Sequence, residues 1–239
     1  MNLLLFFVTL NLILLSRLSL TFKDKGASAG SILKMASLPL LSLLFMEVNM
    51  AWVILLIYLL LYPVAMIYME RSADTLYRNR LIGLLVHIIA VGLIFSPLLN
   101  AEMDRSIVDF FFESGPYVAD SALSLLILLF GGLMVMNEMN IVLRYSLKLL
   151  KLDPIGKTDE TITDQQYNTG RVIGMLERIF IYLFTIAGQY AAIGFILTAK
   201  GVVRYKEFEN RTFAEYVLIG TLLSALLALL TALMLKGFI

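Results

Sequence analysis

Residues 50–69 read MAWVILLIYLLLYPVAMIYM, an apolar run that contains no charged side chain. A helix needs about 20 such residues to cross the hydrocarbon core of a bilayer. The apolar stretch begins as early as Ile32, which makes it too long for one crossing, and the polar residues of the triplet 47–49 (Glu-Val-Asn) interrupt it. We therefore predict two helices, at about 31–47 and 50–69, joined by a tight turn. The alternative is an interfacial or re-entrant half-helix before a single span.

Similar runs recur along the chain. Hydrophobic residues make up 60% of the 239 residues, charged residues make up 15%, and the mean hydropathy is +0.87. A soluble domain has roughly 45–50% apolar and about 25% charged residues. The composition therefore predicts an all-α, polytopic transmembrane helical bundle without a separate soluble domain, and it argues against a soluble enzyme. Seven helices are expected, or six if the second does not cross, at residues 1–20, 31–47, 50–69, 81–100, 121–139, 171–199 and 214–236.

The charges between the runs predict an orientation and a division of the chain. With seven helices and the N-terminus outside, most of the 19 Lys and Arg residues face the inner side, as the positive-inside rule requires. Residues 1–169 would then form an N-terminal set of helices with an acidic outer loop at 101–120 and a cytoplasmic linker. Residues 170–239 would form a C-terminal helix pair, which is the candidate pore module. The loop at 200–213 conflicts with this layout, because its four basic residues would face outside. Either the last two helices do not alternate as drawn, or this loop has a function of its own.

Several kinds of chemistry lack the residues they need. The chain has no cysteine and one histidine, so thiolate sites and sites with several histidine ligands cannot form within it. No nucleotide-binding loop and no hydrolase elbow is present. We therefore expect no enzyme, no cofactor and no metal site.

Residues 170–200 carry a face of small and polar side chains. On a helix, successive three- and four-residue steps align Arg171, Gly174, Arg178, Ile181, Thr185, Gly188 and Ala192, with Gln189 at the border. The bulky side chains Ile173, Leu176, Phe180, Leu183 and Phe184 lie on the opposite side. The last helix has a matching stripe of Thr221, Ser224, Ala228 and Thr231. Such stripes predict either close helix packing or the wall of a water-filled path.

If the path is wet, we expect specific residues to line or gate it. The candidates are Arg178, Thr185, Gly188, Gln189, Ala192, Thr221 and Ser224. Thr185, Gly188 and Gln189 would form the narrow part, and Arg171 and Arg178 would stand at the cytoplasmic mouth, where cationic side chains favour anions.

Two titratable residues are expected to be buried. His87 lies within the apolar run LLVHIIA, and Glu177 lies within the sixth predicted helix. His87 is either a buried histidine with a single hydrogen bond or part of a proton relay, which would need another titratable group facing it. Glu138, near the end of the fifth predicted helix, is expected at the membrane interface.

The basic residues on the predicted inner side have two interpretations. They set the topology and contact anionic lipid. In a ring of subunits they could instead form an electropositive cytoplasmic surface that binds a nucleotide or an oligonucleotide. The residues of this predicted surface are Arg144, Lys148, Lys151, Lys157 and Arg171.

The C-terminal third resembles a known family. The motifs GRVIGMLER, GQYAAIGF, AKGVVRYKE and AEYVLIGTLLS, within about residues 170–225, look like the tail of a widespread bacterial membrane family of unknown function. The N-terminal part usual in that family, with its intramembrane His and Asp, is not apparent here. The architecture is also similar to that of membrane effectors in bacterial anti-phage defence, such as the Hailong type. That resemblance implies a pore controlled by a cytosolic enzyme or by its nucleotide product.

Together these features predict a homo-oligomeric channel or pore, for instance a tetramer, in the bacterial inner membrane. A cytosolic partner or a nucleotide ligand would gate it. A small-solute carrier and a non-conducting membrane scaffold are the alternatives.

Overall fold

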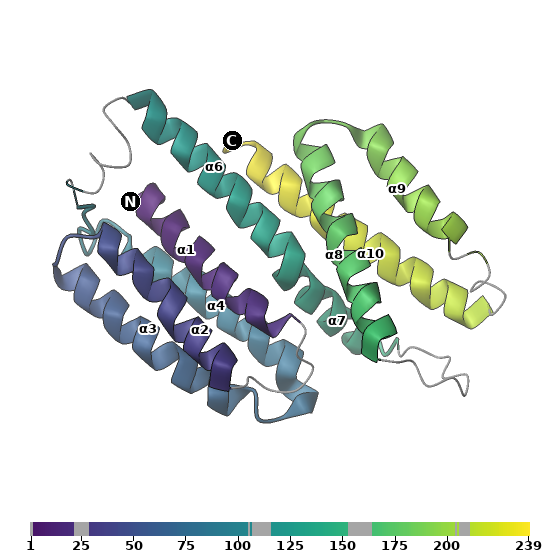
Figure 1. Cartoon of the computed structure of the whole chain (residues 1–239), viewed down its shortest axis with the longest axis horizontal. Helices are drawn as coiled ribbons and strands as arrows, with labels where there is room; N and C mark the ends of the chain where they lie inside the picture. The colour runs from purple at the N-terminus through teal and green to yellow at the C-terminus, as the bar shows by residue number, and fades with distance from the viewer. Residues whose placement is uncertain are drawn as a thin grey trace. The chain divides into compact units, whose positions relative to one another are not determined.

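The structure is a computed structural model that describes residues 2–21, 29–104, 106, 116–152, 164–203, 205 and 211–239. Within these ranges the chain forms helices and no strand, which confirms the predicted all-α fold. The helices are α1 (Leu3–Arg17), α2 (Ala29–Leu40), α3 (Met50–Met69), α4 (Leu76–Ile94), α6 (Pro116–Leu133), α7 (Met139–Leu149), α8 (Asp164–Ile186), α9 (Tyr190–Val203) and α10 (Arg211–Lys236) (Figure 1). Short 3-10 turns extend α1 to Leu20 and α2 to Phe45, and a π-helix, Met134–Glu138, joins α6 to α7.

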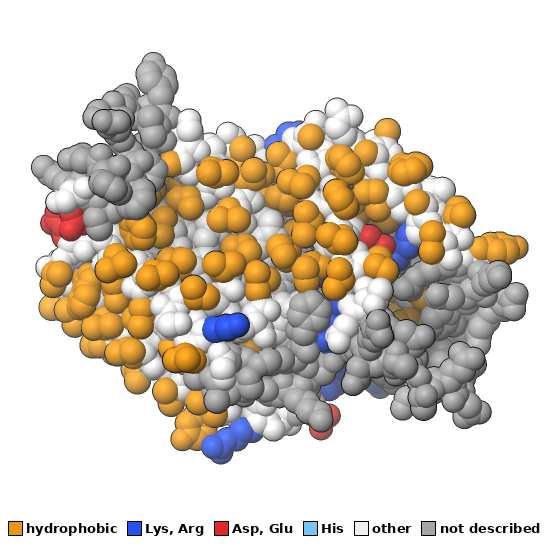
Figure 2. All heavy atoms as spheres, in the orientation of Figure 1, with side chains coloured by type: hydrophobic (Ala, Val, Ile, Leu, Met, Phe, Trp, Pro, Cys, Tyr) orange, Lys and Arg blue, Asp and Glu red, His pale blue; other side chains and the backbone are white. Residues whose placement is uncertain are grey.

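Five helical stretches of the described residues are long and apolar enough to cross a membrane. They are Leu3–Leu20, Met50–Met69, Leu76–Ile94, Ser121–Leu149 and Ala214–Lys236. Two apolar helices, Leu33–Phe45 and Tyr190–Val203, are shorter than the about 20 residues that a crossing needs. Apolar side chains also cover much of the face seen in Figure 2. A surface of this composition is suited to lipid tails rather than to water.

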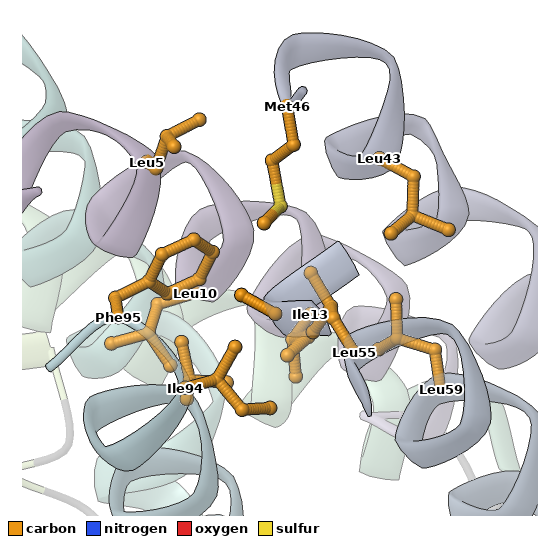
Figure 3. Packing of buried hydrophobic residues seen from close by; sticks show 11 residues of the cluster. Leu5, Leu10, Ile13, Leu43, Met46, Leu55, Leu59, Ile94 and Phe95 are labelled. Atoms are coloured by element: carbon orange, nitrogen blue, oxygen red, sulfur yellow. The ribbon is translucent and has the colours of Figure 1, made fainter. Parts of the chain in front are cut away.

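The chain divides into two compact units. The first contains Met1–Leu133 with Phe238–Ile239, and the second contains Met134–Gly237. In the first unit α1 is surrounded by α2, α4 and α6. Leucine, isoleucine and aromatic side chains from α1, α3, α4 and the end of α2 interlock there, as Figure 3 shows. The buried members of this core are Leu5, Leu10, Ile13, Leu43, Met46, Ala51, Leu55, Leu59, Val91, Ile94 and Phe95.

The second unit corrects the prediction of one long sixth helix at 171–199. Helix α8 ends at Ile186, and α9 starts at Tyr190 after a reversal of the chain (Figure 1). Gly188 makes the reversal possible, because its φ of +71° lies in the left-handed region that costs other residues energy. The two helices are antiparallel, since Glu177 on α8 pairs with Lys200 on α9. A single straight helix would hold these two residues about 35 Å apart.

Other predicted boundaries shift by shorter distances. Helix α4 begins at Leu76, so the charged loop predicted at 70–80 is partly helical and contributes Arg80 to the interior. The second half of the predicted cytoplasmic linker forms the first turns of α8. Residues 107–115 of the predicted acidic loop lie outside the described residues. The helices predicted at 50–69 and 214–236 are confirmed.

Candidate functional site

Arg178 is a buried cation inside the second unit. It lies in the middle of α8 and is 4% exposed. Its Nε donates a hydrogen bond to the carbonyl oxygen of Val135 at 2.7 Å, and its Nη2 donates to the carbonyl of Met136 at 3.1 Å. Nη1 reaches the hydroxyl of Ser224 on α10 at 3.5 Å. The guanidinium is therefore hydrogen-bonded mainly by backbone carbonyls of the π-helix. None of these hydrogen bonds is to a carboxylate.

Glu177 and Lys200 join the two arms of the helical hairpin. The carboxylate Oε2 and the ammonium Nζ are 2.5 Å apart, and the two side chains are 16% and 18% exposed. Glu177 was predicted to be buried and is half-buried.

The predicted pore residues fall into two groups. Thr185 is fully buried, and its hydroxyl donates to the carbonyl of Ile181 in its own helix at 2.7 Å. Thr221 and Ser224 are half-buried on α10, which packs against α8. Gly188 and Gln189 are exposed in the hairpin turn, and Ala192 lies half-buried on α9. The helical face predicted from the sequence is thus split between α8, the turn and α9.

Four of the five bulky side chains on the opposite side of α8 are exposed, and the fifth, Phe184, is half-buried. Ile173, Leu176, Phe180 and Leu183 are 45%, 48%, 47% and 44% exposed. Within one copy of the chain, the polar face of α8 is therefore used for packing against α10 and the π-helix.

The predicted basic surface is only partly exposed. Lys148 and Lys151 are exposed at the end of α7, and Arg144 is half-buried. Arg171 is 9% exposed, which removes it from this surface because its side chain packs inside the unit. Lys157 lies outside the described residues.

Glu138 corrects a second expectation. It is fully buried instead of lying at an interface, and one of its carboxylate oxygens accepts a hydrogen bond from Asn137 at 2.8 Å. Both residues belong to the π-helix, where the helix backbone is widened. This helix therefore concentrates polar side chains inside the second unit.

His87 is the centre of a separate polar cluster in the first unit. It is 1% exposed, and its Nδ1 makes a 2.6 Å hydrogen bond with the hydroxyl of Tyr58 on α3. The ring of Tyr62, one turn later on α3, lies against the imidazole with a centroid distance of 3.8 Å. Nε2 is buried without a hydrogen-bond partner among the described residues. The expectation of a buried histidine is confirmed, and its hydrogen bond is to Tyr58.

Arginines extend this cluster toward the end of the helices. Arg17 is fully buried at the end of α1 and donates from Nη1 to the Tyr62 hydroxyl at 2.8 Å and from Nη2 to the Arg80 carbonyl at 3.0 Å. The Arg80 side chain in turn forms a two-pronged ion pair with Glu70, with N–O distances of 2.9 and 3.2 Å. Polar side chains therefore follow one another from Glu70 to Tyr58, along the seam of α1, α3 and α4.

From the sequence alone, Arg17 and Arg80 are expected only to set the topology, and His87 has no predicted partner. A signal was present in the spacing, because Tyr58 and Tyr62 are four residues apart, as are Gly83 and His87. Residues at this spacing share one helix face, so two polar stripes on neighbouring helices could have been paired.

The fold and these sites define a class: an all-helical protein with helices long and apolar enough to cross a membrane and with cationic side chains buried among them. The described residues contain no cluster of three or more His, Cys, Asp and Glu that could hold a metal ion. No protein-family model, curated protein or solved structure matches this chain. The function is therefore argued from the site alone.

Proposed function

We propose that this chain is the subunit of a homo-oligomeric membrane channel whose ion pathway follows the C-terminal unit. The observation that carries the proposal is the depth of Arg178 among apolar helices. Arg178 precedes Gly188, where the hairpin turns, by about 15 Å of helix. The hydrocarbon core of a bilayer is about 30 Å thick. If the hairpin turn lies near one interface, the guanidinium is therefore near the middle of the membrane.

A cation at that depth is costly, and charged residues inside membrane bundles commonly mark ion pathways. The same unit has two interruptions of regular helix, the π-helix Met134–Glu138 and the turn at Gly188. Irregular backbone at membrane depth is tolerated where protein buries it or where it lines a water-filled cavity. A positively charged pathway of this kind favours anions over cations.

One copy of the chain buries Arg178 and Thr185 inside its own unit. In this proposal, neighbouring copies are therefore needed to complete the wall of the ion pathway. The tetramer, the bacterial inner membrane and a growth-arresting role in anti-phage defence belong to the same proposal. The exposed Lys148 and Lys151 are the described candidates for a surface that receives a cytosolic partner or a nucleotide ligand.

Flux through liposomes tests the proposal. Purified protein is reconstituted in vesicles loaded with a chloride-sensitive dye, after its oligomeric state has been fixed in detergent. We expect anion flux from the wild type and altered selectivity in Arg178→Ala and Gln189→Ala. Arg211→Ala serves as the matched control, because Arg211 is exposed and pairs with Glu215 on the surface. A monomeric protein that leaks no ion, with or without added nucleotide or oligonucleotide, would refute the channel.

The His87 cluster favours a second candidate, a carrier for a small solute. An alternating-access carrier holds its substrate near the midplane, and His87 and Tyr58 lie well inside α4 and α3. In that case His87→Ala abolishes saturable uptake, and no conductance is seen in planar bilayers. A scaffold protein would show neither uptake nor conductance.

A further inference from the structure

The π-helix Met134–Glu138 interrupts an otherwise regular helical stretch, Ser121–Leu149. A π-helical turn is rare, and it is found mostly as a single-turn insertion within an α-helix at functional sites. Widening the helix weakens the regular pattern of backbone hydrogen bonds, so the carbonyl groups of such a turn need other donors. The interruption therefore depends on what binds those carbonyls.

Arg178 supplies two of these donors. Its Nε and Nη2 bind the adjacent carbonyls of Val135 and Met136 at 2.7 and 3.1 Å, while Nη1 is 3.5 Å from Ser224 Oγ. The fixed fork of a guanidinium can reach two neighbouring oxygens at once, which a lysine ammonium cannot do with the same geometry. Gly174, one turn earlier on α8, lies beside this fork, and a Cβ placed there would make an ordinary van der Waals contact of 3.6 Å with Nη1.

The two partners also depend on each other. Without Arg178 the carbonyls of Val135 and Met136 lose buried hydrogen bonds, and without those carbonyls the buried guanidinium loses its closest acceptors. The hydrogen bonds of Arg178 all lie inside the second unit. A change in the backbone conformation of residues 134–138 therefore directly affects α7, α8 and α10, which contact this segment.

We propose that Arg178 is the latch that regulates this pathway, an inference that rests on the proposed channel function. While Arg178 binds the carbonyls of Val135 and Met136, residues 134–138 stay π-helical and the pathway is closed. When the guanidinium withdraws, the segment relaxes to α-helix and the register of α7 shifts by one residue against α8. That shift amounts to about 1.5 Å along the helix axis and about 100° of rotation. The released guanidinium then faces the pathway, where it attracts anions.

A double-mutant cycle, measured by thermal unfolding, tests the latch without any flux measurement. Deleting Met134 removes the extra residue that a π-turn contains, so the segment should become α-helical and no longer need Arg178. We expect Arg178→Gln to lower the Tm of the wild-type background clearly and to change the Tm of the Met134-deleted background little. An equal loss of Tm in both backgrounds would overturn the proposal, because the effects of independent changes on stability add. Arg211→Gln, which removes an exposed arginine, is the matched control.

A distance measurement gives the second readout. The natural chain has no cysteine, so the pair Lys148→Cys and Val172→Cys, both exposed in the second unit, can carry spin labels without background. We expect one distance population in the wild type and a second population in Arg178→Gln, with the control variant unchanged. An unchanged distribution in Arg178→Gln would refute the latch. If Arg178→Gln and the Met134 deletion are coupled in stability but no ion flux is measured, the latch is supported and the channel is refuted. If ion flux is measured but the two changes are not coupled, the channel is supported and the latch is refuted.

Discussion

Arg17, Arg80 and Arg178 lie almost fully inside the chain and are bound by different acceptors. Arg80 pairs with the carboxylate of Glu70, Arg17 binds a tyrosine hydroxyl and a carbonyl, and Arg178 binds two carbonyls. A buried charge is stable only when such acceptors replace its hydration. At the scale of single residues, these sites therefore depend on the precise position of groups that lie far apart in the sequence.

We predict that Arg80→Met is strongly destabilising. The change removes the charge of Arg80 from the buried carboxylate of Glu70, whose side chain is 1% exposed. Breaking a buried ion pair costs roughly 3–5 kcal/mol. Thermal unfolding in detergent measures the loss. Arg78→Met, two residues away on the exposed side of α4, should have little effect. Adding Glu70→Gln to Arg80→Met should restore part of the stability, and a double variant that is no more stable than the single one contradicts this account.

Gly83 allows α4 to approach the Arg17 cluster. A Cβ at this position would lie 3.3 Å from the sulfur of Met66 and 3.5 Å from both Arg17 Nη1 and the Tyr62 hydroxyl. We expect Gly83→Leu to lower stability by about 1–3 kcal/mol through overpacking. Gly132→Leu is the control, since nothing lies within 4 Å of a Cβ there. Equal Tm values for the two variants would show that the close approach has no energetic role.

At the scale of elements, the hairpin of α8 and α9 depends on a turn that only a few residues can form. Gly188 has a φ of +71°, and the Glu177–Lys200 pair then holds the two arms together. Helix α9 has 14 residues and so spans about 21 Å. Helix α9 is therefore too short to cross a membrane by itself, and it depends on packing against α8.

We predict that Gly188→Val loosens the hairpin while Gly188→Asn preserves it. A β-branched side chain at positive φ costs roughly 1–3 kcal/mol, whereas asparagine tolerates this conformation better. Hydrogen exchange of residues 190–203 reports the difference, with faster exchange expected in the valine variant alone. Equal protection in both variants would mean that the turn conformation does not limit the hairpin.

At the scale of the whole molecule, the hairpin explains the misplaced basic loop. Because α9 returns antiparallel to α8, its last residues lie beside the first half of α8 and away from the hairpin turn. Lys236 at the end of α10 lies instead near the hairpin turn, since its Nζ is 3.9 Å from a Cβ built at Gly188. In the proposed membrane topology, Arg211 at the start of α10 is then on the side opposite to Lys236, and we expect it to share that side with Lys151, as the positive-inside rule requires. Treating α8 and α9 as a hairpin instead of one crossing removes the conflict found in the sequence.

Single cysteines placed in this naturally cysteine-free chain test the topology. We expect a membrane-impermeant maleimide to label Lys151→Cys and Val203→Cys from one side of sealed vesicles. Gln189→Cys and Lys236→Cys should react from the other side. Labelling of Lys236→Cys from the same side as Lys151→Cys, with Val203→Cys reacting from the other side, would contradict the hairpin topology and restore a single sixth span.

Local patterns in the sequence are enough to predict the class of fold and the position of most helices. Long apolar runs favour helices because a helix satisfies its own backbone hydrogen bonds, and this local property needs no knowledge of distant residues. For the same reason residues 50–69 and 214–236 could be assigned directly. The amphipathic character of α8 was also readable, since its bulky side chains repeat at helical spacing.

The position at which the chain reverses, and the groups that the buried charges contact, follow instead from the packing of the helices. Residues 186–190 read IAGQY, a stretch apolar enough to continue a helix, and the reversal is stabilised by an ion pair between residues far apart in the sequence. The π-helix at 134–138 depends on Arg178 from another helix, and His87 depends on two tyrosines of α3. Such pairings arise from the packing of distant helices, which local patterns of hydrophobicity do not contain.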